Sequence, residues 1–152
     1  MPRSENSSSD SIASVIHQLG DEEFSQTLAE VAAGKLALRC GHACRIRLAW
    51  QQLSQKPWPL ALATTCDTLR RLPAESGGQE NYHHTLTVAS LRLILQKMKD
   101  SKASTFNAFI SEHPELMTDF ESVISRYYSA ETLARDSARN TFVSPDKRPL
   151  DG

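Results

Sequence analysis

The stretch NYHHTLTVASLRLILQKMK, residues Asn81–Lys99 of this 152-residue chain, decides the fold that the sequence predicts. Drawn as a helix, it carries apolar side chains over a wide arc: Val88, Ala89, Leu91, Leu93, Ile94, Leu95 and Met98. A surface helix shows only one apolar stripe, so a helix this apolar is expected at the centre of a bundle. His83, Thr87 and Ser90 form a polar strip along it, because spacings of four and three place them on one face.

The polar strip predicts either internal hydrogen bonds or the wall of a pocket, because a buried polar group without a partner costs about 1–3 kcal/mol. An imidazole titrates near neutral pH, so His83 is a candidate general acid or base. His42 and Arg45, three residues apart on an earlier helix, are expected to face it, with Arg45 holding a carboxylate or polarising a carbonyl. The alternative is that His83 and His84 belong to the helix N-terminus and bond to the backbone or to Tyr82.

Further helices are predicted on both sides of this segment from apolar spacing and capping residues. They cover roughly residues 10–20, 21–34, 41–55, 59–72, a short piece after 104, 114–127 and 129–140. Asp21, Ser104 and Ser129 are expected as N-caps, and Gly34 as the residue that ends the second helix.

The expected fold class is all-α, a single compact bundle of about eight helices, because connections are short and no segment alternates with period two. Residues 1–8 are predicted to be a disordered lead. Residues 9–152 are predicted to form one helical domain with an irregular C-terminal tail from about residue 141.

Composition excludes several classes of protein. Hydrophobic residues make up 39% of the chain, with only 6 Gly and 7 Pro, which excludes disordered and collagen-like chains. Uncharged stretches such as Pro57–Cys66 are too short to span a bilayer, and no signal peptide is expected at the polar N-terminus. Reduced thiols are expected for the odd set Cys40, Cys44 and Cys66, which favours a cytoplasmic location.

The charge pattern argues against nucleic acid as a partner, because the net charge is −1 and no basic motif is present. Charge is nevertheless uneven, since residues 39–72 carry a local net charge of +5. This region favours a small anionic ligand or an acidic partner. A non-catalytic binding module that uses Arg47, Arg70 or Arg71 is therefore an alternative to an enzyme.

A metal site is a second alternative. Its candidate ligands are His42, His83, His84 and Cys44. The spacing does not match structural zinc motifs, which use two pairs of ligands, so buried thiols are the preferred interpretation of Cys44 and Cys66. No Walker, dinucleotide-binding, nucleophile-elbow, zincin or EF-hand motif occurs, and no cofactor is favoured.

Three segments resemble a group of small, largely uncharacterised bacterial all-helical proteins. They are Gly41-His42 with Arg47-Leu48-Ala49-Trp50, then Tyr82 to Thr87, then Tyr127-Tyr128 with Ser137-Ala138-Arg139, Phe142-Val143 and Pro145-Asp146. In that group a histidine often stands where this chain has Arg45, and a glutamate where it has His84. The resemblance implies a central pocket with His42 and His83 as its matched residues.

The leading hypothesis is a small-molecule enzyme with histidine acid/base chemistry in a buried pocket, of the lyase or dehydratase (cyclase) type. The substrate is expected to be small, polar and possibly anionic. The catalytic residues would be His42, His83 and Tyr128, and the substrate-binding residues Arg45, Thr87, Ser90 and Arg139. The alternative for Arg139 is an ion pair with Asp146 that pins the tail. A divalent metal and a homodimer remain open.

Overall fold

The computed structural model describes residues 20–35, 42–71 and 82–150, and within these ranges the chain forms nine α-helices and no β-strand. The helices are α2 (Asp21–Ala32), α3 (His42–Gln55), α4 (Trp58–Arg71), α5 (His84–Lys99), α6 (Phe106–Glu112), α7 (Glu115–Thr118), α8 (Phe120–Ser125), α9 (Ala130–Leu133) and α10 (Asp136–Asn140). The predicted all-α bundle is confirmed. The helix expected over residues 10–20 and the disordered lead fall outside the described residues.

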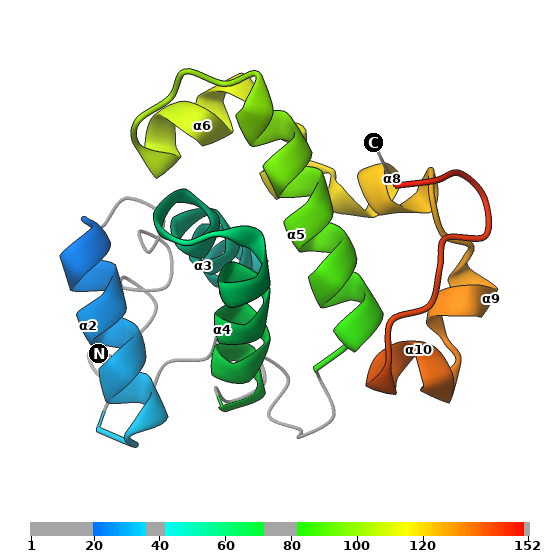
Figure 1. The fold of residues 1–152 in the computed structure, drawn as a ribbon, viewed down its shortest axis with the longest axis horizontal. Helices are drawn as coiled ribbons and strands as arrows, with labels where there is room; N and C mark the ends of the chain where they lie inside the picture. The colour runs from blue at the N-terminus through cyan, green and yellow to red at the C-terminus, as the bar shows by residue number, and fades with distance from the viewer. Residues whose placement is uncertain (1–19, 36–41, 72–81, 151–152) are drawn as a thin grey trace, which may run out of the picture.

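α5 lies at the centre of the helical arrangement, as its wide apolar arc predicts. α3 and α4 follow each other after only Lys56 and Pro57, and the hairpin that they form packs between α2 and α5 (Figure 1). α9 and α10 lie on the other side of α5 (Figure 1). One side of α5 therefore contacts α3 and α4, and the other contacts α10.

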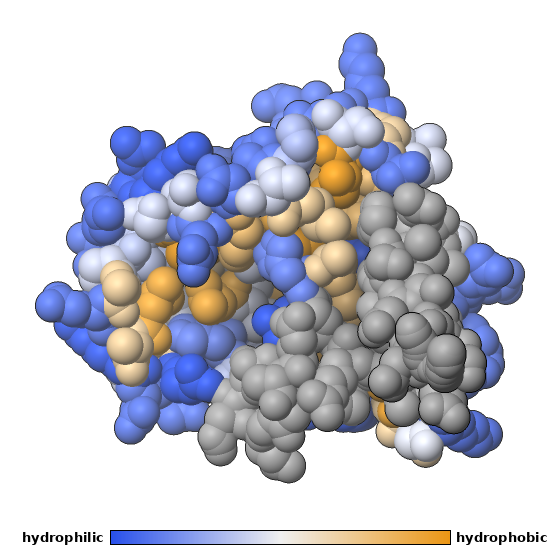
Figure 2. Space-filling view, turned by 180° about the vertical axis from the view of Figure 1, so that it is seen from behind, coloured by the Kyte–Doolittle hydropathy of each residue, from blue (hydrophilic) through white to orange (hydrophobic). Residues whose placement is uncertain are grey.

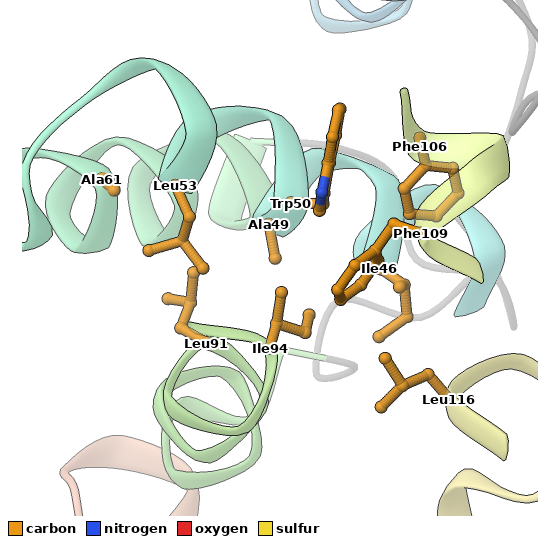
Figure 3. Close-up of a cluster of buried hydrophobic side chains, with 10 residues drawn as sticks. All are labelled: Ile46, Ala49, Trp50, Leu53, Ala61, Leu91, Ile94, Phe106, Phe109 and Leu116. Carbon is orange, nitrogen blue, oxygen red and sulfur yellow. The ribbon is translucent and has the colours of Figure 1, made fainter. Parts of the chain in front are cut away.

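The main hydrophobic cluster joins five helices. Its buried members are Ile46, Ala49, Trp50, Leu53, Ala61, Leu91, Ile94, Phe106, Phe109 and Leu116. Figure 3 shows Leu91 and Ile94 of α5 pointing toward α3, and Phe109 and Leu116 closing the cluster from the side of α6 and α7. Burying a side chain of this size stabilises a fold by about 1.5–3 kcal/mol, so this cluster accounts for much of the position of α5.

A second cluster on the other side of α5 holds the end of the chain. Ala89 and Leu93 of α5 pack there with Val123, Ile124, Tyr128 and the buried Leu150. Hydrogen bonds reinforce this contact: the Thr85 hydroxyl donates to the carbonyl of Thr141 (2.8 Å) and accepts from the Val143 N–H (3.0 Å). Residues 141–150 are therefore not helical, but they are fixed to the bundle.

Among the described residues, Leu60 is the exposed large hydrophobic side chain. On the face opposite to that of Figure 1, hydrophobic side chains reach the surface in a band between hydrophilic ones (Figure 2). In the described ranges, each helix is too short or too polar to cross a bilayer.

Two predicted helix starts are wrong. Gly20, not Asp21, is the N-cap of α2, and the Asp21 carboxylate instead accepts a hydrogen bond from the buried Arg47 guanidinium at 2.8 Å. Thr105, not Ser104, caps α6, with its hydroxyl accepting the Ala108 N–H at 3.1 Å. At α6 the adjacent Ser104 and Thr105 both carry a hydroxyl that could cap, whereas at α2 the N-cap Gly20 has no side chain and only the backbone conformation defines it.

Two predicted helices are each split in two. The segment expected to be one helix over residues 114–127 forms α7 and α8, and that over 129–140 forms α9 and α10. Ser129 is confirmed as an N-cap, because its hydroxyl accepts the Thr132 N–H at 3.2 Å. A helix break leaves carbonyl groups without an N–H partner, so each break needs another donor.

Candidate functional site

The His83 side chain supplies the hydrogen-bond donor at the break between α9 and α10. It is the N-cap of α5, where its Nδ1 accepts the Leu86 N–H at 3.2 Å, and its Nε2 donates to the Leu133 carbonyl at the end of α9 at 2.8 Å. Both ring nitrogens are therefore bonded to the main chain, which fixes the neutral tautomer with the proton on Nε2. Burial, together with the nearby charge of Arg139, lowers the pKa of His83. The bond to the Leu133 carbonyl acts in the opposite direction but does not outweigh them.

His42 holds the other break in the same way. Its Nε2 donates to the carbonyl of Leu116 in α7 at 2.7 Å, and its ring lies 4.9 Å from that of Phe120 at the start of α8. His42 and His83 thus contact different segments, and the structure shows no bond between them. Within the described ranges no group of three or more His, Cys, Asp or Glu could hold a metal ion.

The remaining residues of the predicted site mostly bond to the backbone. The Tyr128 hydroxyl donates to the Val143 carbonyl at 2.6 Å, and burial raises the pKa of Tyr128 to about 12. The Thr87 and Ser90 hydroxyls donate to the carbonyls one turn earlier, those of His83 (2.9 Å) and Leu86 (2.7 Å). The polar strip on α5 is therefore largely satisfied internally, which is the first of its two predicted explanations.

The two arginines predicted to bind the substrate, Arg45 and Arg139, lie on different helices and have different surroundings. Arg139, on α10, lies near enough to His83 for its charge to affect that imidazole. Arg45, on α3, is half-buried and makes no ion pair with another described residue. Arg47 is unsuited to an external partner, because it is 2% exposed and its guanidinium lies over the rings of Phe24 (4.9 Å) and Phe106 (5.3 Å).

A different group of side chains gathers where α4 meets the start of α5. The Tyr82 hydroxyl donates to Nδ1 of His84 at 2.8 Å, and the Arg70 guanidinium approaches the same nitrogen at 3.5 Å. The Arg70 Cζ lies 4.7 Å from the centre of the Tyr82 ring, a cation–π contact that holds it in place. Two donors at Nδ1 make that nitrogen the acceptor, so the proton of neutral His84 is on Nε2.

The surroundings of Tyr82 and His84 keep both side chains neutral. Burial, and then the neighbouring Cys66, raises the pKa of Tyr82 far above its usual value, so the phenol keeps its proton. Burial, and then the charge of Arg70, lowers the pKa of His84, so its imidazole is neutral at neutral pH.

Arg70, His84 and Cys66 border a hollow of about 510 Å³ that is open to solvent. Its lining residues are Leu62, Ala63, Thr64, Cys66, Asp67, Arg70 and His84. Asp67 forms an ion pair with Arg71 at 2.8 Å, one helical turn further on, and Arg70 makes no ion pair with any described residue. As far as the described residues go, the hollow therefore presents the Arg70 guanidinium without a carboxylate partner, beside the neutral imidazole of His84.

The sequence points to the members of this group separately. It places Arg70 in a basic region, makes His84 a candidate metal ligand, Cys66 a buried thiol and Tyr82 a partner of the histidines. The signal in the sequence is the Tyr82–His84 spacing at a helix start, which puts Tyr82 just before the N-cap and His84 on the first turn. No local pattern connects them to Cys66 and Arg70, which come from another helix.

The cysteines correct one expectation. Cys44 is disulfide-bonded, so the predicted reduced thiol at this position is wrong, whereas Cys66 is a buried free thiol as predicted. The sequence could not decide this, because a disulfide requires two cysteines to be adjacent in space. A disulfide sulfur offers no thiolate to a metal, which removes Cys44 from the candidate ligand set.

Comparisons with protein family models, with curated proteins and with solved structures found no match for this chain.

Proposed function

We propose that the hollow between α4 and α5 binds a small anionic ligand through Arg70 and His84. The observation that carries this proposal is the state of Arg70, whose guanidinium is held by the Tyr82 ring and has no carboxylate partner among the described residues. An arginine fixed in this way loses little rotamer freedom when it binds a carboxylate or phosphate. The Nε2–H of His84 supplies a second donor at the edge of the same hollow.

His84, rather than His42 or His83, is the histidine that this proposal assigns to proton transfer. Its Nδ1 is hydrogen-bonded to Tyr82, and its Nε2 has no bonding partner among the described residues. An imidazole with a lowered pKa is neutral, and because Nε2 of His84 already carries a proton, a further proton can be accepted only at Nδ1, by way of the Tyr82 hydroxyl bonded there. The proposed activity is accordingly a lyase or dehydratase type of reaction on a small anionic substrate, which requires a positioned acid and base and no cofactor.

Two sequence-based alternatives fare differently. A non-catalytic binding module would use the same arginine, and it differs from the enzyme only in leaving its ligand unchanged. We do not propose a metal site made of His42, His83, His84 and Cys44. The Nε2 atoms of His42 and His83 bond to backbone carbonyls, and the Cys44 sulfur is in a disulfide. A cytoplasmic location and a homodimer remain proposals.

The test is a titration of the protein with inorganic phosphate and with succinate at constant ionic strength, followed through the NMR signals of the His84 imidazole. Arg70→Gln should weaken binding by about tenfold or more, since a hydrogen bond to a charged group contributes about 1.5–3 kcal/mol. Arg71→Gln is the matched control, because it removes the same charge from the adjacent residue, which pairs with Asp67.

Saturable binding that Arg70→Gln weakens and Arg71→Gln leaves within about twofold supports the proposal. Equal effects of the two variants would reduce the interaction to general electrostatic attraction. Absence of saturable binding for both anions would overturn the proposal.

A further inference from the structure

A second arginine, Arg92 of α5, is held at the surface in the same way as Arg70. Its Cζ lies 5.0 Å from the centre of the Phe142 ring and 6.0 Å from that of Trp58. The Arg92 side chain is exposed and makes no ion pair with another described residue. Aromatic rings therefore hold this guanidinium, and its charge is available to an anion.

The two arginines lie at opposite ends of the contact between α4 and α5. The end of α4 meets the start of α5, where Arg70 approaches His84. The start of α4 meets the middle of α5, where Trp58 lies near Arg92. The two helices thus run antiparallel (Figure 1), and spacings of four place residues 84, 88 and 92 along one ridge of α5.

The surface between the two arginines is apolar and carries little negative charge. Leu62 and Ala63 line the hollow on the side away from Arg70. α4 and α5 together contain one acidic residue, Asp67, and its charge is compensated by the ion pair with Arg71. A ligand that lies along this surface therefore meets apolar side chains in its middle and a guanidinium at each end.

The spacing of the two ends sets the length of such a ligand. His84 and Arg92 are eight residues apart, which corresponds to about 12 Å along α5. An extended chain advances about 1.2 Å per bond, so the dicarboxylate sebacate holds its two carboxylates about 11 Å apart. Succinate is too short to reach both ends.

We propose that the surface between α4 and α5 binds elongated dicarboxylates with an apolar chain, one carboxylate at Arg70 and His84 and the other at Arg92. Each guanidinium can donate two parallel N–H bonds to a carboxylate, and the chain lies over Leu62. The inference rests on the proposed function for the Arg70 end alone. It narrows the ligand from small anions in general to one class of carboxylate.

The experiment is isothermal titration calorimetry with succinate, sebacate and decanoate at constant ionic strength. Sebacate should bind wild type about tenfold or more tightly than succinate, which is too short, and than decanoate, which has one carboxylate. Arg92→Gln should reduce the affinity for sebacate to that for decanoate and leave succinate within about twofold. Lys99→Gln is the matched control, because it removes one exposed charge from the end of α5 and should leave sebacate within about twofold.

The outcomes separate this inference from the proposed function. A preference for sebacate that Arg70→Gln and Arg92→Gln each abolish supports a site with two ends. Equal affinities for sebacate and succinate in wild type, or sebacate binding that Arg92→Gln leaves unchanged, overturn the inference, whereas succinate binding that depends on Arg70 still supports the proposed function. Sebacate binding that Arg70→Gln leaves unchanged contradicts both.

Discussion

Two adjacent histidines in this chain have different roles because of where their nitrogens point. His83 precedes α5, and both of its ring nitrogens form hydrogen bonds to main-chain groups. His84 is the first residue of α5, bonds through Nδ1 to a side chain and borders a hollow. Successive residues of a helix differ by about 100° in direction, so a one-residue step is enough to separate a structural histidine from a candidate functional one.

Replacing His83 by Ala should lower the free energy of unfolding by about 2 kcal/mol. The change removes an N-cap, worth about 1 kcal/mol, and leaves the Leu133 carbonyl without its donor, which costs about 1–3 kcal/mol when buried. His84→Ala should cost about 1 kcal/mol or less, since it breaks one half-buried bond. Urea denaturation measures both, and equal losses would contradict the different roles.

The lowered pKa values of His83 and His84 predict a pH dependence of stability. Both folded-state pKa values lie below the ordinary value of about 6.5, so the unfolded state binds more protons in the interval between. Stability should therefore fall as pH drops below about 6.5 and level off once the folded histidines protonate. Denaturation at pH 7.5 and pH 5.5 tests this, and His83→Gln should reduce the difference; an unchanged slope would speak against it.

At the scale of helices, the two breaks explain why sequence periodicity overestimated helix length. Residues 114–127 and 129–140 keep apolar spacing throughout, yet each is interrupted. The carbonyls of Leu116 and Leu133 bond to His42 and His83 instead of to a helical N–H. An imidazole from a distant part of the chain thus replaces the missing helical N–H donor. Local helix propensity cannot predict such a long-range bond.

Gly34 ends α2 and should be the least replaceable glycine in the described ranges. Its φ of 80° lies in the left-handed region, and the Lys35 N–H bonds to the Glu30 carbonyl at 2.8 Å, as expected for a Schellman cap. Gly34→Ala should cost about 1 kcal/mol, by thermal or urea unfolding. Gly20→Ser is the control, because Gly20 has an ordinary φ of −65° and a serine at this N-cap should keep or raise stability. A larger loss of stability in Gly20→Ser than in Gly34→Ala would contradict this interpretation.

At the scale of the molecule, the end of the chain joins the central helix to the C-terminal helices. Thr85 of α5 bonds to residues 141 and 143, and the Lys147 N–H donates to the Tyr127 carbonyl at 2.9 Å. The Asp146 carboxylate accepts the Ser129 N–H at 2.9 Å, which holds the tail to the start of α9 and is a different contact from the predicted ion pair with Arg139. The tail is thereby part of the fold.

Tyr128 should contribute to this tail and not to ligand binding. Tyr128→Phe removes the donor to the Val143 carbonyl and should lower stability by about 1–2 kcal/mol. Hydrogen exchange at the Val143 amide should become faster, because the segment that holds it loosens. Phosphate binding at Arg70 should be unchanged, and a loss of binding would restore Tyr128 to the site.

The amino-acid pattern predicts the fold class, the central position of α5, the cap at Gly34 and the N-cap at Ser129, because each follows from spacing or from residues within one turn. Tertiary structure decided the rest. His83 finds its acceptor 50 residues away and His42 finds its acceptor 74 residues away, so neither bond leaves a local pattern. Likewise, Cys66 and Arg70 meet Tyr82 and His84 only because α4 packs against α5. Hydrogen-bond partners must lie close together in space, and for these side chains only the packing of the helices brings them close.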